Sequence, residues 1–102
     1  MSTQKNISEL LAPYRARLDA LDADIVALLC RRFDIIREVA AVKIAHNVPV
    51  VIEERIREVI NRAGDKAGDK DRDRVREIYT MLVALACELE EEMIDHQKHK
   101  EK

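Results

Sequence analysis

The sequence contains few of the residues that interrupt helices or build sheets. Its 102 residues include two glycines, two prolines and no tryptophan, and aromatic side chains make up 3% of the chain. Sheet proteins draw on aromatic and β-branched residues, whereas Ala, Leu, Ile, Glu, Arg and Lys are abundant here and are compatible with helices. Because helix-breaking residues are so scarce, we expect an all-α protein built from a few long helices.

The common signatures of metal and nucleotide binding are also missing. Cys30 and Cys87 are too few and too far apart for a disulfide framework or a zinc site. His96 and His99 lie near the C-terminal end and form a weak set of metal ligands. The chain has no CxxC, P-loop or GxGxxG motif. We therefore expect neither a metal nor a cofactor.

Charge and hydropathy exclude several kinds of partner. A net charge of -2 lacks the basic excess that is typical of nucleic-acid-binding proteins. No apolar run approaches the roughly 18 residues that span a bilayer, and residues 1–11 lack the basic-then-apolar order of a signal peptide. With 47% apolar residues, the chain is too apolar for a disordered protein. The composition predicts one cytoplasmic domain over residues 1–102, with no membrane or nucleic-acid partner.

The few helix breakers divide the chain into three segments. Pro13 suits the first turn of a helix, and Pro49 disfavours helical geometry at the residue before it. The polar stretch 64–70 contains both glycines and predicts a solvated loop. We expect helices over residues 13–46, 53–63 and 71–98, with Asp71 as the N-cap of the last one and frayed ends at 1–12 and 96–102.

The first segment carries one apolar stripe, because apolar residues recur in it at steps of three and four. They are Leu18, Leu21, Ile25, Leu28, Leu29, Phe33, Ile36, Val39 and Val42. A helix of about 34 residues is about 50 Å long, whereas a compact domain of this size is only about 34 Å across. One subunit cannot cover the whole stripe, so we expect an intertwined homodimer. The alternative, a monomeric three-helix bundle with a protruding helix, leaves apolar surface in water.

Several basic residues interrupt the apolar segments. Arg32 and Lys43 are eleven residues apart, which leaves only about 20° of rotation between them on a helix. Arg15 points about 100° away from Arg32, so it could reach only a partner subunit's site. Arg55, soon after Pro49, is a fourth candidate. Cations that converge on an apolar interior need anionic partners, either internal carboxylates or a small dianionic substrate, and the spacing alone leaves both open.

These cations belong to a longer ordered pattern. In chain order it consists of Arg15, Leu21-Asp22, Leu28-Leu29-Cys30-Arg31-Arg32, Val42-Lys43, His46-Asn47-Val48-Pro49-Val50 and Glu54-Arg55. Over about residues 10 to 95, the chain resembles the all-helical chorismate mutase family. The resemblance implies a homodimer of three-helix subunits, each with a long first helix, and an active site in each half.

The resemblance also implies roles for the cations. Arg32, Lys43 and Arg55 would line the site within one subunit, and Arg15 would enter from the other subunit. The arginines would hold the substrate's carboxylates, and Lys43 would donate to the ether oxygen as its bond to carbon breaks. Conversion of chorismate to prephenate takes place within one molecule. A cage of cations that folds the substrate and stabilises the developing negative charge therefore suffices, without nucleophile, metal or cofactor.

Family members also carry a Gln or Glu near the ether oxygen, and counting along the last helix from Tyr79 places Glu90 there. A carboxylate would repel the developing charge, so Glu90 would have to be protonated in order to donate. The structural alternative is that Glu90 is one of several solvated acids in a charged run. The run consists of Glu88, Glu90, Glu91 and Glu92.

The chain departs from the family pattern around the substrate's ring. Ile52 stands where an Asp is common, although its backbone could still serve. Ile56, directly after Arg55, stands where a Glu commonly binds the ring hydroxyl, and Ala86 replaces a common Ser. These changes remove polar contacts to the ring but keep the carboxylate clamps, so the reaction type is better supported than the substrate.

Two groups of relatives tolerate an apolar residue after that arginine. One resembles the isochorismate-pyruvate lyases, and the other resembles the 4-amino-4-deoxychorismate mutases, whose Tyr, Cys and Glu spacing is similar to Tyr79, Cys87 and Glu90 here. Plain chorismate mutase is the first expectation because it is the commonest activity of the family. A non-catalytic helical dimer, regulatory or scaffolding, is the alternative from another class.

Overall fold

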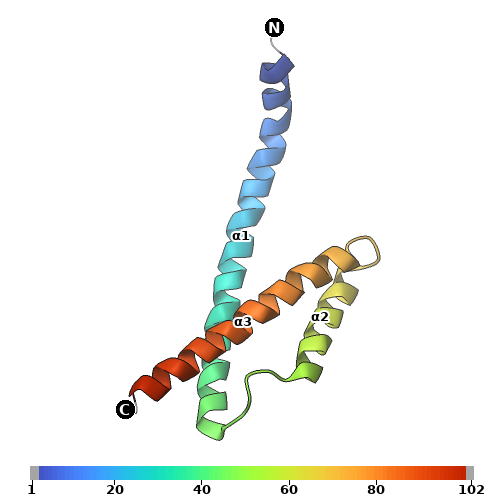
Figure 1. The fold of residues 1–102 in the computed structure, drawn as a ribbon. Helices are drawn as coiled ribbons and strands as arrows, with labels where there is room; N and C mark the ends of the chain where they lie inside the picture. The colour runs from blue at the N-terminus through green and yellow to red at the C-terminus, as the bar shows by residue number, and fades with distance from the viewer. Residues whose placement is uncertain (1–2, 101–102) are drawn as a thin grey trace. The chain divides into compact units, whose positions relative to one another are not determined.

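The computed structural model describes residues 3–100 of the chain, with side chains from residue 6. The chain forms α1 (Thr3–His46), α2 (Glu53–Ala67) and α3 (Arg72–Lys100), and the described residues contain no strand (Figure 1). The predicted all-α fold with a long, a short and a long helix is confirmed. The chain falls into two compact units, Met1–Phe33 and Asp34–Lys102. The first unit holds most of α1, and the second holds the end of α1 with α2 and α3.

The start of α1 differs from the prediction. The helix begins at Thr3, so Pro13 lies inside it and not in its first turn. Proline removes one backbone hydrogen bond from a helix interior and crowds the carbonyl four residues earlier, but it does not prevent helical geometry upstream. The residues before it, including Glu9, Leu10 and Leu11, favour helix. The frayed segment predicted for residues 1–12 is therefore helical from Thr3, and residues 1–2 lie outside the described part.

A tight cap ends α1 and explains why the helix stops at the predicted place. Asn47 adopts a left-handed conformation with φ 55°, which Asn tolerates better than most residues. The N–H of Val48 donates to the Lys43 carbonyl at 2.9 Å, and that of Asn47 donates to the Ile44 carbonyl at 3.5 Å. This pair of bonds is the Schellman pattern of a helix C-terminus, and Pro49 follows directly.

The second boundary also differs from the prediction. We expected α2 to end before Gly64, but it continues to Ala67 and ends at Gly68, whose φ is 82°. A glycine inside a helix costs only about 1 kcal/mol, so Gly64 alone does not end the helix. The remainder of the predicted loop is a short turn before α3. The last helix extends to Lys100, so the predicted fraying at 96–102 is not seen over 96–100.

In the second unit α2 packs along α3 (Figure 1). Gly64 is buried, and a Cβ there would lie 2.5 Å from Cγ of Arg76 and 3.1 Å from Cγ of Arg72. The missing side chain is therefore what lets these two arginines lie across α2. Ala40, Leu82, Val83 and Ala86 form the buried apolar core of this unit. Since Ala40 belongs to α1, the end of that helix contributes to the core.

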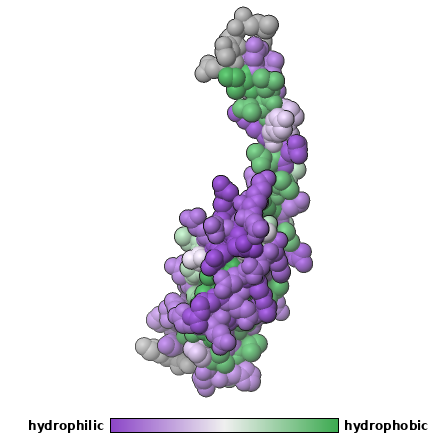
Figure 2. Space-filling model, turned by 90° about the vertical axis from the view of Figure 1, so that its right-hand side faces the viewer, coloured by the Kyte–Doolittle hydropathy of each residue, from purple (hydrophilic) through white to green (hydrophobic). Residues whose placement is uncertain are grey.

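The first unit exposes the apolar stripe of α1. Leu18, Leu21, Ile25 and Leu28 are each more than half exposed. Figure 2 shows hydrophobic side chains along this part of α1. Among the described residues, no helix is both long enough and apolar enough to cross a membrane.

Candidate active site

An ion pair joins the end of α1 to α3. The ammonium Nζ of Lys43 lies 2.9 Å from Oε1 of Glu90, and the two side chains are only 15% and 5% exposed. The Oε1 atom is buried, and the Lys43 ammonium is the group that the structure places against it. A buried carboxylate without a cationic partner is very costly, so each charge of the pair stabilises the other.

The Lys43 ammonium also binds the segment between α1 and α2. It donates a hydrogen bond of 2.9 Å to the main-chain carbonyl of Val50. The sequence pattern singled out residues 46–50 as part of the resemblance, but it gave no sign that this carbonyl meets Lys43. A main-chain acceptor leaves no residue-type signal, because every residue carries the same carbonyl.

Glu90 is not one of the solvated acids of its run. It is 4% exposed, whereas Glu88, Glu91 and Glu92 are exposed. Ala86, one turn earlier on α3, is 4% exposed and belongs to the same buried face. Glu90 therefore lies on the apolar side of α3, where a carboxylate requires a partner, and Lys43 supplies one.

Arg55 has a different environment from the one that the pattern implies. It lies on α2, and Nη1 donates at 2.7 Å to Oε1 of Glu58, while its side chain is 60% exposed. Its charge is thus turned toward solvent and an acid of its own helix. Ile52 is the N-cap of α2 without a side-chain hydrogen bond, and its carbonyl accepts from the N–H of Ile56 at 3.1 Å. Ile56 is half-buried.

The remaining predicted cations belong to the first unit. Arg15 is exposed, whereas Arg32 is half-buried at the last turn of that unit. The structure thus brings together Lys43 and Glu90, with Val50 as an unforeseen third member. We call these three the Lys43 cluster.

A thiol lies near the Lys43 cluster. Burial raises the pKa of the Cys87 thiol, and the negative charge of Glu90 raises it further, while the charge of Lys43 lowers it. The thiol is therefore protonated at neutral pH and is not an activated nucleophile. Cys30 is exposed on α1.

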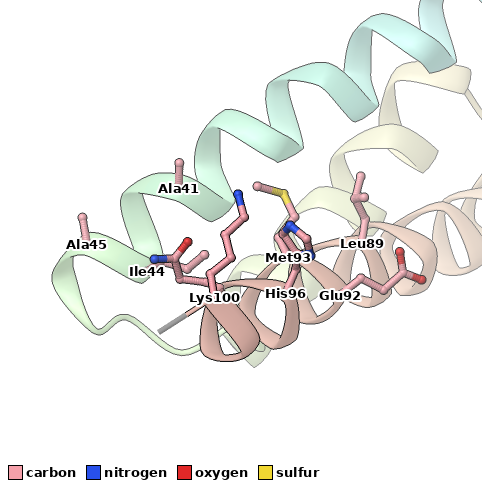
Figure 3. Close-up of a pocket in the computed structure, with 9 residues that line it drawn as sticks. Ala41, Ile44, Ala45, Leu89, Glu92, Met93, His96 and Lys100 are labelled. Carbon is pink, nitrogen blue, oxygen red and sulfur yellow. The ribbon is translucent and has the colours of Figure 1, made fainter. Parts of the chain in front are cut away.

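Two cavities adjoin the ends of α1 and α3. The larger, of about 520 Å³, has an apolar wall of Ala41, Ile44, Leu89 and Met93, with His96 and Lys100 among its polar residues (Figure 3). The smaller, of about 410 Å³, is lined by Lys43 together with the segment Asn47–Pro49 and the end of α3. The smaller cavity adjoins the Lys43 cluster, because Lys43 is part of its lining. No other predicted site residue lines either of the two cavities. Among the described residues, no group of three or more His, Cys, Asp or Glu is arranged to hold a metal ion.

The comparisons with known proteins define the class of the protein. Residues 14–91 match the model of the chorismate mutase type II family. The match covers most of the chain, including Lys43, Val50 and Glu90, so the chain belongs to this family. The chain matches no curated protein and no solved structure in the corresponding comparisons.

Proposed function

We propose that the protein is a chorismate mutase that converts chorismate to prephenate. Membership of the chorismate mutase type II family supports this reaction class. The observation that carries the proposal is the buried ion pair of Lys43 and Glu90, at the two positions where the resemblance implies a cation and a Gln or Glu near the ether oxygen. Lys43 also lines the smaller cavity, where a positive charge that is already held in place stabilises a developing negative charge better than water does.

In the proposed mechanism Lys43 donates to the ether oxygen as the carbon–oxygen bond breaks. The electrons of the rearrangement move within the substrate, so the protein's task is to fold the substrate and to stabilise the negative charge on that oxygen. Glu90 can donate a hydrogen bond to that oxygen only in its acid form, whereas a glutamine carries N–H donors at every pH. We therefore expect Glu90→Gln to retain activity and Glu90→Ala to lose most of it. Equal activity of the two variants removes Glu90 from the mechanism.

The complete site requires a homodimer in this proposal. The exposed stripe of α1 supports association, because a monomer leaves Leu18, Leu21 and Ile25 in water. Arg32 and Arg55 of one subunit and Arg15 of its partner would hold the substrate's carboxylates. Arg55 would have to leave Glu58 to do so, and an exposed ion pair of this kind is weak enough to exchange. The location would be cytoplasmic.

One sequence feature keeps a second activity open. Ile56 offers no polar group to the ring hydroxyl of chorismate, which favours isochorismate or 4-amino-4-deoxychorismate as the alternative substrate.

The experiment follows the ultraviolet absorbance of chorismate, isochorismate and 4-amino-4-deoxychorismate with the purified protein. Consumption of chorismate with formation of prephenate supports the proposal. Consumption of one of the other compounds alone reassigns the substrate, and turnover of none of the three favours a non-catalytic dimer. Arg32→Ala serves as the inactive control for whichever substrate reacts.

A further inference from the structure

The Lys43 ammonium has two acceptors at hydrogen-bond distance. It lies 2.9 Å from Oε1 of Glu90, and it donates at 2.9 Å to the main-chain carbonyl of Val50. The carboxylate stands on a side chain with several rotatable bonds, whereas the main-chain carbonyl has a direction that the backbone fixes. An ammonium has three N–H donors, so these two contacts leave one N–H for a substrate.

The segment that carries this carbonyl is held in place from both ends. The N–H of Val48 donates to the main-chain carbonyl of Lys43, so residue 43 binds the segment through its backbone as well as through its side chain. Pro49, with its fixed φ, lies between these two bonds, and Asn47, in the left-handed region, directly precedes the first of them. Lys43 and residues 47–50 thus form a closed loop, and Ile52, the N-cap of α2, follows two residues later.

We propose that Val50 is a positioning residue, whose main-chain carbonyl directs the remaining N–H bond of Lys43 toward the substrate. This inference rests on the proposed function, because it assigns Lys43 a substrate to face. A lysine side chain has many rotamers. If its ammonium is oriented before the substrate binds, the entropy cost of ordering this side chain is not part of the activation barrier. The carbonyl therefore contributes to kcat more than to substrate binding.

The test weakens this carbonyl and keeps every side chain. Replacement of Val51 by 2-hydroxy-3-methylbutanoic acid converts the Val50–Val51 peptide bond into an ester, whose carbonyl is the poorer acceptor. The Val51 N–H that is lost takes part in no described hydrogen bond outside the helices. The matched control places the same hydroxy acid at position 50, which weakens the Pro49 carbonyl and leaves that of Val50 an amide.

The first readout needs no turnover. The side-chain NH₃⁺ resonance of ¹⁵N-labelled Lys43 reports whether the ammonium is held, because a held group exchanges its protons slowly. We expect this resonance in the native protein and in the control ester, and its broadening or loss in the Val51 ester. A Val51 ester that keeps the native resonance overturns the proposal, whatever the protein catalyses.

The second readout uses the substrate found for the native protein. We expect kcat of the Val51 ester to fall about tenfold with KM within about twofold, a loss that corresponds to about 1.4 kcal/mol in the transition state. An unchanged or increased kcat overturns the proposal, since it shows that the carbonyl is idle or competes with the substrate. If the native protein turns over none of the three substrates, the proposed function fails, while the resonance still decides whether Val50 orients Lys43.

Discussion

At the scale of single residues, the Lys43–Glu90 pair affects the stability of the fold as well as the proposed reaction. Both side chains are removed from water, and each charge is tolerated because the other is 2.9 Å away. Replacing one residue of such a pair by an uncharged one leaves the other charge buried without a partner. Replacing both residues leaves no buried charge. This difference allows the pair to be tested apart from catalysis.

We expect Lys43→Met to lower the free energy of unfolding by about 3 kcal/mol. The double variant Lys43→Met/Glu90→Gln should recover most of that loss, because no buried charge remains. Urea denaturation followed by circular dichroism measures both values. The matched control is Lys98→Met, at an exposed position of α3, which should change stability by less than about 0.5 kcal/mol. Equal stability of Lys43→Met and the control would contradict the burial of the pair.

The thiol of Cys87 gives a prediction about pH. Because burial and then Glu90 raise its pKa, less thiolate is present at a given pH than in the unfolded chain. Alkylation of Cys87 by iodoacetamide in a Cys30→Ser background should therefore rise at higher pH in the folded protein than in urea. The opposite order of the two pH profiles would show that Lys43 outweighs burial and the nearby carboxylates.

The same residues show how far the sequence predicts the site. The apolar spacing identified Lys43, and the resemblance identified Glu90, although its acidic neighbours suggested a solvated residue as the alternative. The burial of Glu90 excludes the solvated alternative, and burial depends on the packing of α3 against the end of α1. The role of Glu90 in the reaction remains a proposal. The Val50 carbonyl was beyond prediction because it is a main-chain group. The predicted roles of Arg15, Arg32, Arg55, Ile52 and Ile56 in substrate binding remain proposals.

At the scale of elements, helix ends were harder to predict than helices. The apolar periodicity predicts all three helices, but the preference of proline for a first turn places the start of α1 ten residues late, because Pro13 lies inside the helix. The glycine-containing polar stretch places the end of α2 too early, because Gly64 allows Arg76 and Arg72 to pack closely. In both cases the surrounding helix outweighs the preference of a single residue.

The cap of α1 gives a prediction at this scale. Asn47 has φ 55°, so Asn47→Ala should cost about 1 kcal/mol, while Asn47→Gly should preserve or raise stability. Thermal unfolding of the two variants measures the difference. Because the cap also carries the loop that reaches Val50, we expect the alanine variant to weaken the Lys43 ammonium resonance as well. A more stable alanine variant would contradict the left-handed geometry.

At the scale of the whole molecule, the proposed dimer makes each active site a product of two chains. If Arg15 acts in the partner's site and Arg32 in its own, Arg15→Ala and Arg32→Ala homodimers are both inactive. After mixing and refolding together, heterodimers contain one intact site, and we expect about a quarter of the native activity to return. Activity that stays absent in the mixture, with heterodimers shown by mass spectrometry, would place both arginines in the same subunit's site.

The exposed stripe of α1 has a thermodynamic consequence. If a second chain covers Leu18, Leu21, Ile25 and Leu28, folding and assembly are one equilibrium, and the melting temperature rises with the logarithm of protein concentration. Dilution, without heat or denaturant, would then be enough to unfold the protein.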